Sequence, residues 1–292
     1  MEPGSISVTS QIGTLFVVAT PIGNLDDISV RARSVLSAVT IIAAEDTRRT
    51  GRLLNRLGIQ ATLLSCHEHN EAKRIPQLIA RLRAGEDVAL VSDAGTPLIS
   101  DPGYRLVSAV AEQGMPVSPV PGCSAVIAAL SIAGLPTDAV LFAGFLPSSE
   151  VKRRAGLEAL RDRTETLVLY ESVHRIGATL AAMVEVFGAD RRAVAARELT
   201  KLHETVYRGS LAEVGALVAD DPGGSKGEYT LVIAGAEAVS PDDTELDRVV
   251  QILLGYMGVR QAADAAVKLL GVKKNAAYKR ALALREGSDE AF

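Results

Sequence analysis

The amino-acid sequence predicts two α/β domains followed by a short helical segment. From residue 14 onward, short apolar runs alternate with amphipathic stretches, which is the pattern of strands joined by crossover helices. The series restarts near residue 140, and beyond residue 243 the pattern is purely helical. The chain has 292 residues, of which 48% are hydrophobic, so two domains of ordinary size can each bury a core.

The first domain is expected to span residues 14–134. Helical periodicity fills the intervals between its apolar runs, and Gly58 is expected to end one helix. Asn70 is expected to cap the next, because its side chain can accept a hydrogen bond from the first helical turn. The strands are predicted by apolar runs at 15–19, 41–44, 61–65, 88–91 and 117–120.

The second domain is expected over residues 138–236, after a seam at 135–138. Its strands are predicted at 141–144, 166–170, 193–197 and 229–234, with an antiparallel addition at 204–208. Residues 236–243 have the composition of a linker, and residues 244–286 are expected to form a basic helical segment. Residues 1–13 are small and polar without periodicity, which predicts a flexible leader.

The charge of the chain excludes a uniformly basic nucleic-acid-binding protein, because 35 acids outnumber 31 lysines and arginines. Any contact with RNA must therefore come from local patches. One patch lies at 152–154, and another lies at 259–285, where seven cations face the single acid Asp264. The residues expected to hold RNA in these patches are Lys152, Arg153, Arg154, Lys273, Lys274, Lys279 and Arg280.

The cysteines and the hydropathy favour a cytoplasmic protein without a membrane segment. Cys66 and Cys123 lie far apart, and no secretory signal is recognisable at the N-terminus, so a reducing compartment without a disulfide is expected. The long apolar stretch at 115–135 is interrupted by prolines and glycines, which a membrane-spanning helix rarely accepts. That stretch is therefore assigned to the core.

Loops that follow strands are the first candidates for a ligand site, because open α/β sheets bind ligands at the carboxyl ends of their strands. The loop at 93–103 has Asp93 and Asp101 around a Gly-Thr-Pro segment. Carboxylates can accept hydrogen bonds from ribose hydroxyls, and Gly95 lets the backbone approach a ligand closely. A plain surface loop explains the same composition equally well. The dinucleotide fingerprint and the P-loop are both absent.

Acids and histidines elsewhere allow several interpretations. Glu45 and Asp46 fit a general base with a hydrogen-bonding neighbour, and they also fit ordinary acids at a helix start. His67 and His69 form a pair that suits zinc, but no second cluster completes a metal site, so no metal is expected. The histidines can instead bind substrate or transfer a proton.

Several strings occur in the order typical of the tetrapyrrole methylase superfamily, and within it the sequence resembles the branch that methylates small-subunit ribosomal RNA. The resemblance covers nearly the whole chain from residue 14 to about 285. Cys123 departs from the pattern at a position where the family usually has proline. The strings lie at 15–27, 43–50, 67–71, 90–104, 144–147, 170–172, 196–201, 226–228 and 273–275.

The resemblance implies a fold, a cofactor and a substrate. It implies two α/β domains with S-adenosylmethionine in the cleft between them, a homodimer, and methylation of a cytidine 2′-oxygen near the decoding centre of 16S ribosomal RNA. It implies that the RNA and the reacting hydroxyl are handled by Glu45, Asp46, Arg48, His67, Glu68 and Asn70. It implies that the donor is held by Asp93, Ala94, Gly95, Thr96, Pro97, Asp101, Pro102, Gly122, Ser124, Ala125, Tyr170, Glu171, Glu228, Tyr229 and Thr230.

The hydroxyl of a ribose is a weak acid, so a base that accepts its proton assists the reaction. Glu45 is the first choice for this base and His67 the second, while Arg48 is assigned to a phosphate, to the orientation of Glu45 or to a surface ion pair. Two alternatives stay open. The chain can be a methylase of corrin precursors or protein side chains, or a catalytically silent RNA-binding assembly factor.

Overall fold

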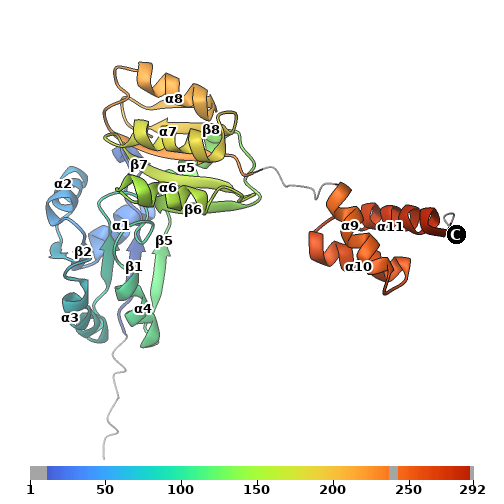
Figure 1. The fold of residues 1–292 in the computed structure, drawn as a ribbon. Coiled ribbons are helices and arrows are strands. Elements are labelled where there is room, and N and C mark those ends of the chain that lie inside the picture. Colours follow the sequence, from blue (N-terminus) through green and yellow to red (C-terminus); the bar gives the residue numbers. More distant parts are fainter. Residues whose placement is uncertain (1–11, 237–242, 290–292) are drawn as a thin grey trace, which may run out of the picture. The chain divides into compact units, whose positions relative to one another are not determined.

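The computed structural model describes residues 12–236 and 243–289. The chain divides into two units, 1–236 and 237–292, and the described part of the larger unit contains two five-stranded sheets (Figure 1). The described part of the smaller unit is helical. The expected α/β class with a C-terminal helical segment is therefore confirmed. The predicted leader, up to residue 11, and the predicted linker, at 237–242, lie outside the described residues.

The first sheet is parallel, and its strands lie in the order β3-β2-β4-β1-β5. Helices α1 and α2 cover one face and α3 and α4 the other, which explains the nearly continuous apolar strand sequences. The strands are β1 (Leu15–Val18), β2 (Ile41–Ala44), β3 (Thr62–Ser65), β4 (Val88–Val91) and β5 (Val117–Val120). The helices are η1 (Leu25–Asp27), α1 (Val30–Ala38), α2 (Thr47–Leu57), α3 (Glu71–Arg83) and α4 (Tyr104–Glu112).

The ends of α2 and α3 show how local sequence sets these boundaries. Asp46 caps α2 by accepting a hydrogen bond from the N–H of Arg48, and Gly58 ends the helix in the left-handed conformation at φ +70°. Asn70 occupies the N-cap position of α3, but the prediction that its side chain caps this helix was wrong. Its backbone is in the helical region, and its amide oxygen instead accepts a hydrogen bond from the N–H of His67 at 2.8 Å.

The second sheet is mixed, in the order β6-β7-β10-β8-β9. Strands β6 and β7 are parallel, whereas β10 runs antiparallel to both β7 and β8. The antiparallel strand expected at 204–208 is confirmed as β9, which pairs with β8. The strands are β6 (Val140–Phe145), β7 (Thr166–Ser172), β8 (Arg192–Arg197), β9 (Thr205–Ser210) and β10 (Glu228–Ile233). Helices α6 (Glu150–Glu158), α7 (Ile176–Phe187) and α8 (Leu211–Asp220) pack on one face.

Helix α5 (Ala125–Ala133) joins the two sheets. It follows the last strand of the first sheet, but its buried residues pack against the second sheet. Val126 and Ala129 belong to the same apolar cluster as Val168, Val194 and Val232. The helix is apolar around most of its circumference, and such a helix is stable when it is buried between elements. A domain boundary after residue 134 stays a prediction, since α5 ties the two halves together.

The smaller unit contains α9 (Asp243–Leu254), α10 (Val259–Leu270) and α11 (Lys274–Asp289). Small side chains, including Ala263, Ala277 and Ala281, let these helices approach closely around Leu246 and Val250. Two ion pairs add to this packing. Lys274 pairs with Asp264 at 2.7 Å, and Arg280 pairs with Asp247. Among the described helices, none has both the length and the apolar composition needed to cross a bilayer.

Candidate active site

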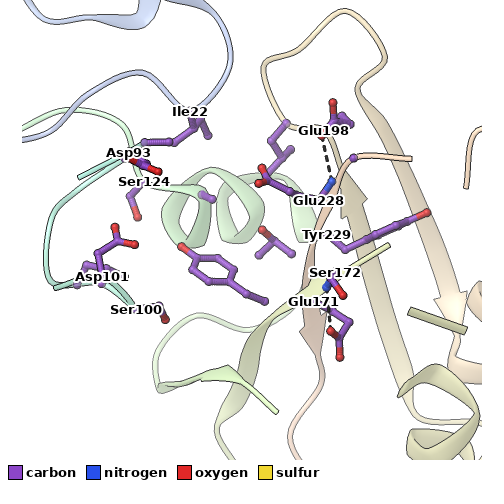
Figure 2. A pocket seen from close by; sticks show the side chains of 18 of the residues that line it. Ile22, Asp93, Ser100, Asp101, Ser124, Glu171, Ser172, Glu198, Glu228 and Tyr229 are labelled. Atoms are coloured by element: carbon purple, nitrogen blue, oxygen red, sulfur yellow. Dashed lines mark hydrogen bonds between the residues drawn. The ribbon is translucent and has the colours of Figure 1, made fainter. Parts of the chain in front are cut away.

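A cavity of about 420 Å³ lies where the strand tips of the first sheet face the second sheet (Figure 2). Parallel strands bring their carboxyl ends to one edge, so the loops after β2, β4 and β5 meet there. The opposite wall comes from β7, β10 and the segment after β8. Figure 2 shows Asp93 and Asp101 on one side and Glu171 and Glu228 on the other.

The walls of the cavity are acidic. Four glutamates and two aspartates line it, against one arginine and one lysine. A cleft lined mainly by one sign of charge concentrates the field and attracts ligands of the opposite sign. The cavity therefore suits a ligand that carries positive charge. The charged lining residues are Glu45, Asp93, Asp101, Glu171, Glu198, Glu228, Arg49 and Lys201.

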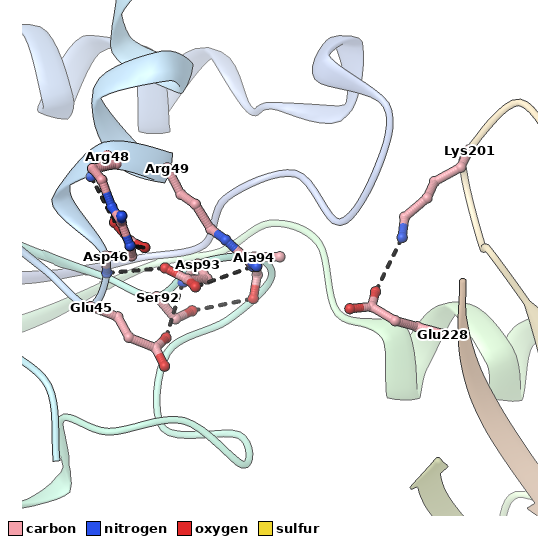
Figure 3. Close-up of polar contacts among 9 residues, drawn as sticks. All are labelled: Glu45, Asp46, Arg48, Arg49, Ser92, Asp93, Ala94, Lys201 and Glu228. Carbon is pink, nitrogen blue, oxygen red and sulfur yellow. Dashed lines mark hydrogen bonds and ion pairs between the residues drawn. The ribbon is translucent and has the colours of Figure 1, made fainter. Parts of the chain in front are cut away.

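Hydrogen bonds fix the acids on the first wall (Figure 3). The N–H of Asp93 donates to Glu45 Oε2 at 3.2 Å, and the N–H of Asp46 donates to Asp93 Oδ1 at 3.0 Å. Arg49 Nη1 lies 3.2 Å from Asp93 Oδ2. The tips of β2 and β4 thus hold Glu45 and Asp93 in a defined arrangement, in which Asp46 and Arg49 act as supports.

Two carboxyl groups on this wall bind their protons more tightly than usual. Burial raises the pKa of Glu45, and the negative charges of Asp93 and Asp46 raise it further. The hydrogen bond from the Asp93 N–H and the positive charge of Arg49 oppose this rise. Burial also raises the pKa of Asp101 to about 6. The negative charges of Glu45 and Asp93 add to this rise, and a hydrogen bond from Ser92 opposes it. Both groups therefore change charge closer to neutral pH than exposed carboxyls do.

The backbone around the cavity is strained. Gly95 adopts φ +78°, and its backbone forms hydrogen bonds in both directions with Thr20, at 2.8 and 3.0 Å. Within the described residues, every non-glycine residue with positive φ lies in one of two loops, at 98–100 or 198–200, and both loops border the cavity. Such conformations cost about 1 to 3 kcal/mol each and cluster at functional sites. The residues are Leu98, Ser100, Glu198 and Thr200.

The second wall holds an ion-pair network at the start of β10. Lys201 Nζ lies 2.8 Å from Glu198 Oε1 and 3.1 Å from Glu228 Oε2, and the N–H of Glu228 donates to Glu198 Oε1 at 3.0 Å. Burial opposes the charge on Lys201, but the bonds to the two glutamates outweigh it and raise its pKa. Lys201 therefore stays charged and holds the two acids together, and Figure 3 shows its bond to Glu228.

Two tyrosines on this wall have different surroundings. Tyr170 packs edge-on against Phe142, with 5.1 Å between ring centroids, and burial and the nearby Asp101 raise the pKa of its hydroxyl. The hydroxyl of Tyr229 donates to the carbonyl of Gly224 at 2.8 Å, so it is not directed at a ligand. Tyr229 therefore contributes to the wall without offering its hydroxyl.

The structure brings together twelve of the fifteen residues expected to hold the donor. The three that do not line the cavity are Pro97, Pro102 and Gly122. A Cβ added at Gly122 would lie 3.0 Å from Ala19 Cβ, so this glycine allows close packing of the turn on β1. The binding roles of the twelve stay predictions. They are Asp93, Ala94, Gly95, Thr96, Asp101, Ser124, Ala125, Tyr170, Glu171, Glu228, Tyr229 and Thr230.

Of the residues expected to handle the reacting hydroxyl, only Glu45 lines the cavity. Asp46 caps α2, and its bonds to Arg48 lower its pKa to about 2. The side chain of Arg48 is 87% exposed and pairs with Asp46, which fits the ion-pair alternative. His67 and Glu68 follow the edge strand β3 outside the cavity lining, and the His67 ring lies against the Asn70 amide. Glu45 is thus the better placed of the two candidate bases.

Sequence reasoning missed three charged lining residues, Arg49, Glu198 and Lys201. Arg49 follows Arg48, the arginine that the sequence analysis selected. Its position on helix α2 brings its side chain to Asp93, and the sequence alone does not show this. Glu198 and Lys201 lie in a string that carried the family resemblance without an assigned role. The sequence signal that could have indicated their ion pair is the opposite charge of two residues three positions apart.

The residues expected to bind RNA have unequal access to it. Arg153 is 7% exposed and donates to the carbonyl of Ser148, so little of its side chain is accessible and its assignment to RNA stays a weak prediction. Arg154 is exposed and pairs with Glu185 at 2.9 Å. Lys274 and Arg280 are exposed but pair within the helical unit, whereas the exposed Lys152, Lys273 and Lys279 form no ion pair among the described residues. The exposed lysines are the stronger candidates.

Comparison with known proteins identifies the family. A profile of the tetrapyrrole (corrin/porphyrin) methylases matches residues 14–215. The chain belongs to the tetrapyrrole methylase family. A second profile, described as the RsmI C-terminal HTH domain, matches residues 240–285. The tetrapyrrole methylase fold continues beyond the first match, because β10 completes the second sheet at Ile233.

Similar members of the tetrapyrrole methylase family are curated as ribosomal RNA small subunit methyltransferase I. The relative from Pseudomonas aeruginosa is 50% identical over 273 residues, which cover 92% of this chain and 97% of the relative. The relative from Escherichia coli O157:H7 is 47% identical, covering 94% of this chain and 97% of the relative. A uroporphyrin-III C-methyltransferase from Thermus thermophilus, complexed with S-adenyl homocysteine, shares the fold at TM-score 0.50 and 17% identity, over 75% of this chain and 97% of that one.

Proposed function

We propose that this chain transfers a methyl group from S-adenosylmethionine to the 2′-hydroxyl of a cytidine in the decoding region of 16S ribosomal RNA. The observation that carries the proposal is the acidic cavity at the strand tips, in a chain 47% to 50% identical to relatives named ribosomal RNA small subunit methyltransferase I. The acidic cavity accounts for a cationic cofactor, and the relatives account for the RNA substrate.

The residues of the cavity fit S-adenosylmethionine. The cofactor supplies a methyl group that its positively charged sulfonium has already activated. Asp93 and Asp101 offer carboxylates to its hydroxyls or to its charge, and Ile22 and Leu199 offer apolar surface. At Gly95, a Cβ would lie 3.3 Å from Ile22 Cγ2, so the bare backbone leaves room that a side chain would fill.

Glu45 acts as the base in this proposal, and its supports keep it in place. The N–H of Asp93 holds one carboxylate oxygen, which leaves the other free to accept the proton of the ribose hydroxyl. A raised pKa improves this function, because the carboxylate is a stronger base while it stays ionised near neutral pH. The rest of the contribution is positioning, since alignment of two reactants alone can lower a barrier by several kcal/mol, about 7 to 11 at most.

Contacts with the substrate outside the cavity are also part of the proposal. The exposed Lys152, Lys273 and Lys279 are assigned to RNA phosphates, in naked RNA or in the assembled small subunit. The helical unit that contains the last two matches a helix-turn-helix profile, which is consistent with a nucleic-acid contact. A homodimer and a cytoplasmic location are also parts of the proposal.

Two measurements test the function. Calorimetric titration with S-adenosylmethionine is expected to give saturable binding. Incubation with small subunits from cells that lack the gene is expected to restore one ribose methylation, located by mass spectrometry of the 16S RNA. A protein that binds the donor without methylating RNA would favour another methylase of this family, and one that binds no donor would favour a silent assembly factor.

Affinity for the donor is expected to fall at acidic pH. Asp101 has a pKa of about 6, so its carboxylate takes up a proton and loses its charge as the pH falls from 7.5 to 5. A neutral carboxyl no longer attracts a positively charged ligand. Titrations across this range are expected to show weaker binding below pH 6 in the wild type and a much smaller pH effect in Asp101→Asn. An equal pH effect in both proteins would assign the titration to another group.

A further inference from the structure

Helix α2 exposes a row of arginines that the cavity does not use. The helix contains Arg48, Arg49, Arg52 and Arg56, and it contains no acid. Thr50, Leu54 and Leu57 are buried, so they face the core of the first domain. All four arginines are exposed. We call these four residues the arginine ridge.

We propose that the arginine ridge is a binding site for the phosphate backbone of the RNA substrate. The inference rests on the proposed function and names the surface that holds the RNA beside the cavity. Arg49 lines the cavity, so one end of the ridge begins at the site of reaction. Arg48 and Arg56 are eight positions apart, or about 12 Å along a helix. That distance corresponds to about three nucleotides at a rise of 3.4 Å per nucleotide in one strand.

The ion pairs of the ridge involve two of its four arginines. Arg49 pairs with Asp93 at the cavity, and Arg48 pairs with Asp46. Among the residues that the structure describes, Arg52 and Arg56 have neither an ion pair nor a side-chain hydrogen bond. Two adjacent guanidinium groups in a chain of net charge -4 thus point to solvent without a structural partner. Guanidinium groups bind phosphate oxygens through paired hydrogen bonds, which makes arginine well suited to this ligand.

A hollow lies at the far end of the ridge. The hollow measures about 440 Å³, and its charged lining residues are Arg33, Arg56 and the single acid Asp26, beside apolar residues that include Leu25 and Ile28. Arg33 Nη2 donates to the carbonyl of Leu57 at 3.2 Å, which fixes this guanidinium at the end of α2. An arginine guanidinium can stack on an unstacked base and can bind a phosphate, so the two arginines of the hollow offer groups that suit a nucleotide.

The charge of the cavity explains why RNA must be held outside it. The six acids that line the cavity repel phosphates, so a reacting ribose can enter only if cations outside bind the flanking backbone. The ridge begins at the edge of the cavity and supplies those cations. A second copy of the chain is a poorer occupant, because a symmetric interface through the same face would bring arginines against arginines.

The test removes the two unpaired arginines. The double variant Arg52→Gln, Arg56→Gln is compared with the wild type in binding to small-subunit RNA at several salt concentrations. The slope of log affinity against log salt is negative, and each lost phosphate contact reduces its magnitude by about 0.7 for single strands, so the magnitude is expected to fall by about 1.4. The KM for small subunits is expected to rise, while kcat and the affinity for S-adenosylmethionine stay at the wild-type values.

A matched control removes the same charge elsewhere. Arg161 and Arg163 are exposed, form only 3.9 Å ion pairs with Glu158 and Glu165, and lie outside the cavity lining. Arg161→Gln, Arg163→Gln is expected to keep the wild-type salt slope. An unchanged slope in the ridge variant, or an equal loss in both variants, would overturn the proposal, as would loss of self-association in place of RNA affinity. A wild type that methylates no RNA would refute the proposed function separately, because the binding measurement does not depend on turnover.

Discussion

Glu45→Gln is expected to reduce the rate of methyl transfer by a factor of about 10² to 10⁴ without changing the affinity for S-adenosylmethionine. Glutamine keeps the shape of the side chain and can still accept the hydrogen bond from the N–H of Asp93. It cannot accept the proton of a ribose hydroxyl. Single-turnover kinetics with saturating donor and calorimetric titration separate the two quantities.

Glu68→Gln is the matched control, because the family resemblance includes this carboxylate among the reacting residues but the structure places it outside the cavity lining. It is expected to keep nearly full activity. If Glu45→Gln also keeps full activity, Glu45 is not the base. If only Glu68→Gln is slow, the substrate approaches from the side of β3 instead.

Glu171→Ala is expected to lower the free energy of unfolding by about 3 kcal/mol, the lower end of the cost of breaking a buried ion pair. The carboxylate is 2% exposed and accepts hydrogen bonds from Arg175 Nη2 at 3.1 Å and Thr179 Oγ1 at 2.6 Å. Without it, Arg175 keeps only its bonds to carbonyls of the 146–147 segment, and the buried Thr179 hydroxyl loses its acceptor. Denaturant unfolding of the full chain measures the change.

Glu185→Ala provides the comparison for a pair on the surface. Glu185 and Arg154 lie 2.9 Å apart, but both side chains are more than half exposed, so the expected loss is below about 1 kcal/mol. Equal losses in the two variants would mean that the buried position of Glu171 adds no stability. The affinity of Glu171→Ala for the donor is also expected to fall, because Glu171 forms part of the cavity wall.

The strands could be predicted from sequence because burial on both faces makes them apolar. The run at 88–91 becomes β4, in which every residue is buried. The order of the strands within each sheet could not be predicted from these apolar runs. Nothing in the pattern places β10 between β7 and β8, since pairing partners depend on contacts between distant segments. The packing of α5 on the second sheet was missed for the same reason.

The part of the candidate site that could be predicted from sequence is the loop with a distinctive residue composition. Gly95, flanked by Asp93 and Asp101, belongs to a loop whose composition already indicates close approach to a ligand. Side chains whose direction depends on packing were not predictable. Arg49 points to the cavity while Arg48 points to solvent, and Arg153 lies below the surface between two exposed neighbours. The Lys274–Asp264 pair shows that a cationic segment can use part of its charge internally.

The central position of β10 has a consequence for the synthesis of the protein. A nascent chain that ends before residue 228 already contains β7 and β8, but the strand that pairs with both has not yet been synthesised. Strands β7 and β8, which pair with β6 and β9 on their other sides, each then expose one unpaired edge, and such edges are prone to aggregate. The same strand supplies Glu228, Tyr229 and Thr230 to the cavity. Synthesis of β10 therefore supplies both the strand that joins the β6-β7 pair to the β8-β9 pair and one part of the cavity wall.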